Sequence, residues 1–155
     1  MSGESDLLRA QDYALKLLSY RERSREEIQV RMERKGFEKD VIEKVLRYLE
    51  SQKYLDDRRF AELWAHDRLR KGYGKWRVIL ELREKGVNQE IIDGVVKEVY
   101  GTVDEIGMAL DLVNRRGYDL GSREDKGVAR RASQFLRRRG FSFSVIREVM
   151  SRMLE

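Results

Sequence analysis

The chain of 155 residues contains neither cysteine nor proline, and it has a single histidine. Without cysteine the protein has no disulfide, no thiolate nucleophile and no cysteine-ligated zinc or iron site. Without proline it lacks the residue that interrupts helices most strongly. A chain free of cysteine suits the reducing cytoplasm, where we expect this protein to reside.

Long apolar segments are also absent. No run approaches the roughly 20 apolar residues that a membrane-spanning helix needs, and the N-terminal residues lack the basic and apolar regions of a signal peptide. No segment alternates between apolar and polar residues for long enough to indicate a strand. We therefore expect a protein without a membrane partner that is built from helices alone.

The residue patterns of the familiar reaction classes are missing as well. The sequence has no phosphate-binding GxxxxGK loop, no GxSxG and no HExxH. The only imidazole, that of His66, has no second metal ligand at a suitable spacing. Acidic pairs such as Glu26 and Glu27 stand where helices are expected to begin, and carboxylates stabilise helix N-termini. We expect no catalytic site, no metal and no cofactor, and a hydrolase or nuclease is the least favoured alternative.

Three glycines mark an internal repeat. Gly36, Gly86 and Gly140 each follow a basic residue and precede an apolar one. A helix often ends at a glycine in the left-handed conformation, and a basic residue in its last turn suits the helix dipole. Apolar residues recur at the same distances from each glycine, at helical spacing: Ile28, Val78 and Ala132; Met32, Leu82 and Leu136; Ile42, Ile92 and Ile146; Leu46, Val96 and Met150.

Each glycine therefore stands between two helices, and a further helix is expected before each pair. In the first pair, Ser24 and Glu27 have the spacing of a capping box, which predicts that a helix starts near Arg25. The helices after the glycines are expected over residues 41–52, 89–100 and 143–154.

The sequence thus predicts an all-α fold of three tandem three-helix repeats. A unit of about 50 residues is close to the lower limit for a self-sufficient core, so that neighbouring repeats must stabilise one another. We expect an elongated array, either straight or curved. Its repeats are predicted over residues 1–55, 56–104 and 105–155.

Positive charge is concentrated in the third repeat. Lys and Arg number 33 against 28 for Asp and Glu, which gives a net charge of +5. Residues 106–155 hold 11 basic and 6 acidic residues, whereas the preceding segments are nearly balanced. This excess points to an acidic or polyanionic partner at the third repeat.

Arginines of the predicted second helix in this repeat are the main candidates for partner binding. The apolar stripe of that helix leaves them on a common outer face, and guanidinium groups suit carboxylates and phosphates. Simple solvation of this face is the alternative. Trp76, between two basic residues, is the best candidate for an aromatic contact. The candidate partner-binding residues are Arg115, Arg116, Arg130, Arg131, Arg137, Arg138 and Arg139, with Lys75, Trp76 and Arg77.

The junction between the first two repeats carries the most distinctive motif, Tyr54-Leu55-Asp56-Asp57-Arg58-Arg59-Phe60-Ala61. This motif resembles the YLDDxxFA signature of the RecX family. Two further blocks resemble that family in the same order: Arg21 to Phe37 (RxRS, then KGF) and Arg68 to Val87 (RxxxG, then ELxxKG). The third repeat resembles it mainly in its helical pattern and in Arg139-Gly140-Phe141.

In structural terms we expect the motif to form a joint between repeats. Tyr54 and Leu55 would close one core, Asp56 or Asp57 would cap the next helix, and two apolar residues would begin the next core. With the repeat glycines, the expected structural signature is Tyr54, Leu55, Asp56, Asp57, Phe60, Ala61, Gly36, Gly86 and Gly140.

The resemblance to RecX implies a function. Proteins of that family regulate the RecA recombinase: a member is expected to lie in the helical groove of the RecA–DNA filament and mainly to inhibit recombination, ATP hydrolysis and coprotease activity. We expect a monomer that binds this filament and needs no cofactor. The alternative is a protein whose helical repeats bind DNA directly in the major groove, as helix-turn-helix units do; a generic helical scaffold ranks third.

Overall fold

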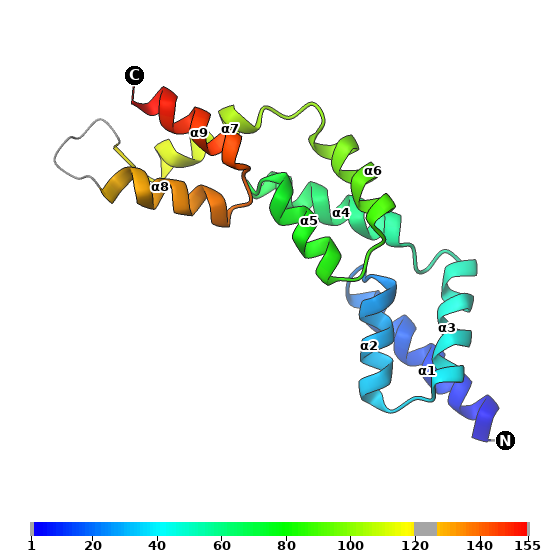
Figure 1. Ribbon diagram of the computed structural model, residues 1–155. Coiled ribbons are helices and arrows are strands. Elements are labelled where there is room, and N and C mark those ends of the chain that lie inside the picture. Colours follow the sequence, from blue (N-terminus) through cyan, green and yellow to red (C-terminus); the bar gives the residue numbers. More distant parts are fainter. Residues whose placement is uncertain (1, 120–126, 155) are drawn as a thin grey trace. The chain divides into compact units, whose positions relative to one another are not determined.

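The computed structural model describes residues 2–119 and 127–154, and these ranges contain helices but no strand (Figure 1). The all-α prediction is therefore confirmed, and the observed starts and ends of helices after the glycines lie within two residues of those predicted. The helices are α1 (Ser2–Tyr20), α2 (Arg25–Lys35), α3 (Lys39–Ser51), α4 (Asp57–Arg70), α5 (Lys75–Glu84), α6 (Gln89–Tyr100), α7 (Glu105–Arg115), α8 (Gly127–Arg138) and α9 (Phe143–Met153).

The chain forms two compact units. One comprises Met1–Leu63 and Leu82–Asp93, and the other comprises Trp64–Glu81 and Gly94–Glu155. The division passes through α4, α5 and α6. The predicted repeat boundaries lie instead in the connections before α4 and α7, and the division into three repeats of those bounds stays a prediction.

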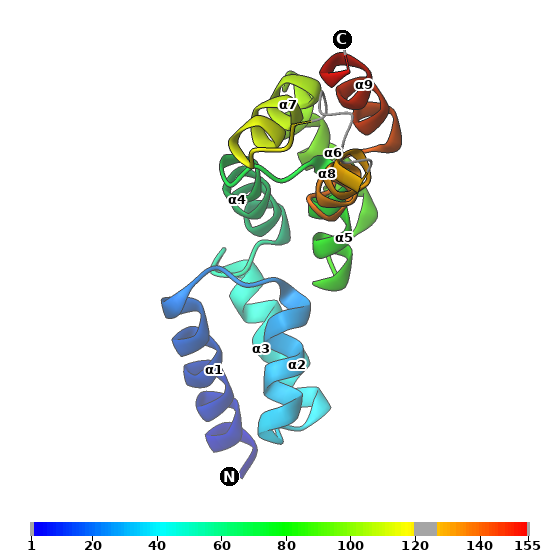
Figure 2. The ribbon, with the colours of Figure 1, turned by 90° about the vertical axis from the view of Figure 1, so that its left-hand side faces the viewer.

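In the first unit, α1, α2 and α3 pack against one another (Figure 2). Their apolar stripes meet in a core that the closing Leu55 also joins. The predicted capping box is present, because the Ser24 side chain accepts from the N–H of Glu27 and the Glu27 carboxylate accepts from the N–H of Ser24. The buried core residues are Ala10, Ala14, Leu17, Ile28, Met32, Ile42, Val45, Leu46, Leu49 and Leu55.

In the second unit, α7, α8 and α9 pack in the same way. The predicted stripe of α8 is buried at Ala132, Phe135 and Leu136, while Val128 is only half-buried. Side chains of α7, of α9 and of the connection before α9 complete this core, with Ala109, Val113, Phe141, Ile146 and Val149 buried.

The repeat glycines end their helices as predicted. Gly36, Gly86 and Gly140 have φ angles of +95°, +76° and +96°, which only glycine adopts without strain. Their three helices, α2, α5 and α8, are called the glycine-ended helices below.

A recurring joint connects the glycine-ended helices. A joint is the contact between the first turn of a glycine-ended helix and residues of the next predicted repeat along the chain. In the first unit, the Ser24 hydroxyl donates to the Lys85 carbonyl at the end of α5 (2.7 Å). The N–H of Arg25 donates to the Asp57 carboxylate at the start of α4 (2.8 Å).

The second unit repeats this joint at the first turn of α5. The N–H groups of Gly74 and Trp76 donate to the carbonyls of Arg139 and Gly140, at 2.8 and 3.1 Å. The N–H of Lys75 faces the Glu105 carboxylate at the start of α7 (3.4 Å). The positive end of one helix dipole thus meets the negative end of another, and amides that no helix can satisfy internally find acceptors.

Close approach gives two of the glycines a second role. A Cβ atom on Gly140 would collide with the backbone of Arg77, and one on Gly86 would collide with the Glu26 side chain. Gly36 has open space in the same position, because no glycine-ended helix precedes its own. The joint therefore depends on the missing side chain at Gly86 and Gly140.

The YLDD motif forms part of the first joint, with one correction. Leu55, Phe60 and Ala61 are buried as predicted. The prediction for Tyr54 is wrong: this residue is 49% exposed, because the chain leaves α3 through a left-handed residue, Lys53, that turns the tyrosine outward. Its main-chain carbonyl accepts from Arg59 instead.

The two aspartates of the motif have different roles. Asp56 caps α4 by accepting from the N–H of Arg59 (3.1 Å). Asp57 instead accepts from Arg25 in the joint. Burial raises the pKa of the Asp57 carboxyl, although the hydrogen bond from Arg25 acts in the opposite direction. Burial likewise raises the pKa of Glu105, its counterpart in the second joint.

Replacing Gly140 by alanine tests the close approach, with Gly36→Ala as the matched control. Both changes incur the left-handed backbone cost of roughly 1–2 kcal/mol. Only Gly140→Ala should add an overpacking cost of about 1–3 kcal/mol. Urea unfolding monitored by circular dichroism measures both losses. Equal losses would show that the approach of Arg77 to Gly140 contributes nothing.

Asp57→Asn tests the joint carboxylate through pH. Because burial raises the folded pKa of Asp57 above its ordinary value of 3.8, the folded state holds the proton more tightly. The wild type should lose stability relative to the variant as the pH rises through the raised pKa. Asparagine keeps an acceptor for Arg25 and carries no charge, so the variant should be as stable as wild type or more stable at neutral pH. A less stable variant there would contradict this account.

Candidate functional site

The arginine face of α8 is the first part of the candidate site. We define it as Arg130, Arg131, Arg137 and Arg138, whose residues are all exposed. Arg130 and Arg137 are seven residues apart and therefore share one stripe of the helix, and Arg131 and Arg138 share a neighbouring stripe. The structure therefore brings these four predicted residues together on one helix surface.

Arg139 has a different environment from its neighbours. Its guanidinium group lies over the rings of Tyr73 and Phe135, at 4.5 and 5.6 Å from the ring centroids. It also donates to the carbonyl of Lys71 (3.2 Å). These contacts make Arg139 a part of the second joint, where it connects the end of α8 to the loop before α5.

Arg77 is also engaged in the second joint. It donates to the Arg138 carbonyl (2.8 Å) and pairs with Glu81 (3.4 Å). Its guanidinium group lies 5.0 Å from the centroid of the Tyr73 ring, and that of Arg68 lies 5.2 Å from the same centroid. Together with Arg139, three guanidinium groups surround Tyr73, whose own carbonyl accepts from the Tyr100 hydroxyl (2.8 Å).

The remaining predicted basic residues also have contacts within the second unit. Arg115 pairs with Asp111 one helical turn away (2.9 Å). Arg116 lies over the Phe135 ring, 4.6 Å from its centroid. Lys75 takes part in the joint through its main-chain N–H. The structure thus separates the predicted set into the exposed arginine face and residues with structural contacts.

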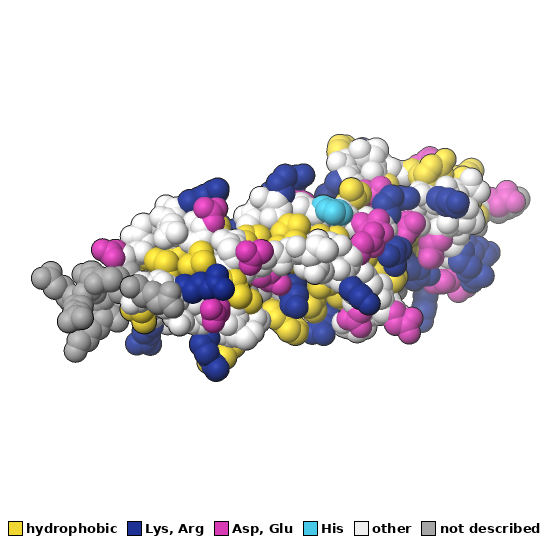
Figure 3. Space-filling view, turned by 90° about the horizontal axis from the view of Figure 1, so that it is seen from above, with side chains coloured by type: hydrophobic (Ala, Val, Ile, Leu, Met, Phe, Trp, Pro, Cys, Tyr) yellow, Lys and Arg dark blue, Asp and Glu magenta, His cyan; other side chains and the backbone are white. Residues whose placement is uncertain are grey.

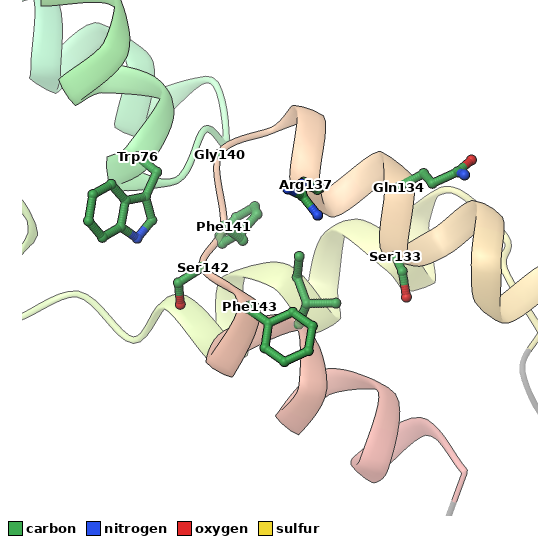
Figure 4. A pocket seen from close by; sticks show the side chains of 9 residues that line it. Trp76, Ser133, Gln134, Arg137, Gly140, Phe141, Ser142 and Phe143 are labelled. Carbon is green, nitrogen blue, oxygen red and sulfur yellow. The ribbon is translucent and has the colours of Figure 1, made fainter.

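Trp76 borders a pocket of about 640 Å³ in the second unit. Trp76 is 49% exposed, and across the pocket Phe143 at the start of α9 is 69% exposed. Figure 4 shows Trp76 at one end, Ser133 and Gln134 at the other, and the segment from Gly140 to Phe143 between them. The lining residues are Trp76, Ser133, Gln134, Arg137, Gly140, Phe141, Ser142, Phe143 and Ile146.

Sequence reasoning missed Tyr73 and Phe143 as members of this region. Phe143 could have been noticed, because it lies outside the apolar stripe of α9 and yet is a large apolar residue. Tyr73 has no comparable signal: its role depends on Arg139, 66 positions further along the chain.

Three other kinds of polar group were candidates for chemistry: the imidazole of His66, clusters of acidic residues and buried hydroxyls. His66 is exposed on the surface (Figure 3). No group of three His, Asp or Glu side chains within 2–119 and 127–154 is arranged to hold a metal ion. The most perturbed hydroxyl, that of Tyr100, has its pKa raised by burial, while it donates to a backbone carbonyl. The acidic pair at residues 124 and 125 and the loop glycine at 121 lie outside the described residues.

None of the helices in the described part of the chain combines the length and the apolar character that crossing a membrane requires.

Comparison with known proteins gives consistent matches. A family model described as the first three-helix domain of RecX matches residues 10–49, and one described as the second three-helix domain of RecX matches residues 56–96. The regulatory protein RecX of Chlorobium limicola is 38% identical over 144 residues, covering 92% of this chain and 88% of that protein. The regulatory protein RecX of Halorhodospira halophila is 36% identical over 136 residues, covering 88% and 83%.

Solved structures agree on the fold. The crystal structure of RecX from Lactobacillus salivarius superposes with a TM-score of 0.79 at 22% identity, covering 97% of each chain. A second crystal structure, of a regulatory protein RecX, gives a TM-score of 0.80 at 22% identity, covering 97% of this chain and 74% of the other.

Arg139→Lys tests whether Arg139 acts in the joint, with Arg138→Lys as the control. Lysine keeps the charge but loses the planar contact with Tyr73 and Phe135. We expect Arg139→Lys to lower the free energy of unfolding by about 1 kcal/mol and Arg138→Lys to leave it unchanged, both measured by urea titration. Equal behaviour of the two variants would assign Arg139 to the solvated surface.

Proposed function

The chain belongs to the RecX family of regulatory proteins, and we propose that it binds the RecA–DNA filament and mainly inhibits its recombinase, ATPase and coprotease activities. The observation that carries the proposal is the family membership over most of the chain. The exposed arginine face of α8 supports it, because it supplies the positive surface that an acidic protein or a phosphate backbone would bind.

The proposal places the protein in the helical groove of the filament. Binding there blocks access to the recombining DNA without any chemistry by the regulator itself, so the protein needs neither enzymatic activity nor a cofactor. It acts in the cytoplasm, as a monomer. Arg130, Arg131, Arg137 and Arg138 are the residues that meet acidic RecA surface or nearby phosphates. Arg115, Arg116, Lys75 and Trp76 extend this surface, and Arg77 and Arg139 act through the joint.

Direct DNA binding is the second candidate. The same arginine face favours it, because guanidinium groups bind phosphates in duplex DNA as readily as carboxylates in protein. Binding of this kind would occur without RecA and would weaken steeply with salt.

One titration separates the two functions. DNA-dependent ATP hydrolysis by RecA is measured with increasing amounts of this protein, beside a gel shift on the same DNA without RecA. We expect inhibition at concentrations too low to shift bare DNA. A strong DNA shift without inhibition would instead establish the second function.

Charge reversal tests the arginine face. Arg130, Arg131 and Arg138 are changed together to glutamate, which should weaken filament binding at least tenfold while the helicity stays unchanged. The control reverses Lys39, Lys44 and Arg47, three exposed residues of α3, and changes the net charge equally. If both triple variants weaken filament binding to the same extent, the loss reflects net charge and the α8 face has no specific role.

A further inference from the structure

We propose that the pocket between Trp76 and Phe143 holds an apolar side chain of an acidic segment on the partner protein. This inference rests on the proposed function and adds the chemistry of the contact. Two large aromatic side chains stand exposed at its edge, at 49% and 69%. Exposed apolar groups that border a concave site mark places where proteins bind one another.

The size and the floor of the pocket suit one or two bulky side chains. Its volume of about 640 Å³ lies within the range of roughly 300–1,000 Å³ that is usual for ligand pockets. Phe141 and Ile146, at 3% and 8% exposure, form an apolar floor. Burial of an aliphatic or aromatic anchor against this floor removes apolar surface of both partners from water.

The second joint holds the pocket in its open form. The N–H of Trp76 donates to the Gly140 carbonyl (3.1 Å), and this bond fixes α5 beside the segment that carries Phe141. The hydroxyl of Ser142 caps α9 by accepting from the N–H of Val145 (3.2 Å), which fixes the backbone next to Phe143. Since these bonds exist before the partner arrives, binding does not have to order the pocket.

The charges around the pocket select an acidic partner. Arg137 is an exposed lining residue, and Arg130 shares its stripe of α8. The Arg147 guanidinium group covers the Phe143 ring at 4.7 Å from the centroid. No carboxylate is among the nine lining residues, and Arg137 is the one charged residue among them, so the lining itself would attract aspartate or glutamate beside the anchor.

A protein segment fits this site better than a nucleic acid does. Nucleic acids bind mainly through a row of phosphates that needs cations at regular intervals, whereas this lining has a single arginine and a floor of carbon atoms. A nucleobase stacked on Trp76 is the competing occupant, and the experiments below distinguish it.

The first test measures the affinity of variants for RecA filaments assembled on single-stranded DNA. Trp76→Ala and Phe143→Ala should each weaken binding about tenfold, as expected for buried interface anchors. Leu80→Ala is the matched control, because Leu80 lies one turn from Trp76 on α5, is 56% exposed and does not line the pocket. It should bind within about twofold of wild type. Circular dichroism checks that all three variants keep their helicity.

If wild type binds the filament and all three variants bind as it does, the pocket is not the contact, while the proposed function stands. If wild type fails to bind, the proposed function falls, and the pocket is judged by a second measurement that needs no filament.

This second measurement follows the indole N–H signals of the two tryptophans by nuclear magnetic resonance. Trp64 serves as the internal control, because its indole N–H donates to Glu81 (3.2 Å). The probes are a twelve-residue acidic peptide with one central phenylalanine, the same peptide with alanine in its place, and a single-stranded oligonucleotide. We expect the phenylalanine peptide alone to shift the Trp76 signal.

Three outcomes would overturn the proposal. These are an unmoved Trp76 signal at millimolar phenylalanine peptide, equal shifts with the alanine peptide, and a larger shift with the oligonucleotide. The last outcome would assign the pocket to nucleobases.

Discussion

Amide groups at the start of a helix have no partners within that helix, and the fold depends on how two sets of them are satisfied. At the start of α5 the partners come from the next predicted repeat. At the start of α2 the next repeat accepts from the Arg25 amide, whereas the amides of Ser24 and Glu27 are satisfied within the capping box. In each joint the next repeat contributes two acceptors to the same helix turn. One is the carboxylate of the first residue of its first helix, and the other is a main-chain carbonyl at the end of its second helix. Because small helical units bury little surface on their own, these joints add stabilising hydrogen bonds that a single repeat lacks.

The joint also accounts for the position of the candidate site. The close approach of Gly140 to Arg77 leaves no room for a side chain, and it places Trp76 of α5 beside the segment that leads into α9. The arginine face belongs to the helix that ends at this same glycine. The second joint therefore holds an apolar pocket and a positive surface next to one another, which is the combination that the proposed acidic partner would bind.

Much of the fold could be predicted from sequence because its signals are local. Helix ends followed from glycine chemistry and from the Ser24 and Glu27 box, and the buried stripes followed from helical spacing. The joints could not be predicted in the same way, since Lys85 and Ser24 are 61 positions apart and neither residue signals its partner. The outward turn of Tyr54 was missed because it depends on the backbone of Lys53, a residue with no preference for that conformation.

The candidate site shows the same division. Four exposed arginines followed from the period of α8, whereas the roles of Arg139 and Tyr73 depend on packing between distant segments. The pocket combines residues of α5, α8 and α9 with the connection between α8 and α9. Among its lining residues only Trp76 and Arg137 were predicted to bind a partner, whereas Gly140 and Ile146 were predicted as structural positions of the repeat.

Hydrogen exchange of main-chain amides tests the joint most directly. The N–H groups of Gly74 and Trp76 stand at the start of α5, where amides ordinarily exchange fast because no helical carbonyl accepts from them. The account predicts that both are protected like the interior amide of Leu82, since the carbonyls of Arg139 and Gly140 accept from them. Exchange at the rate of an open helix end would contradict it and would remove the joint as the basis of the site.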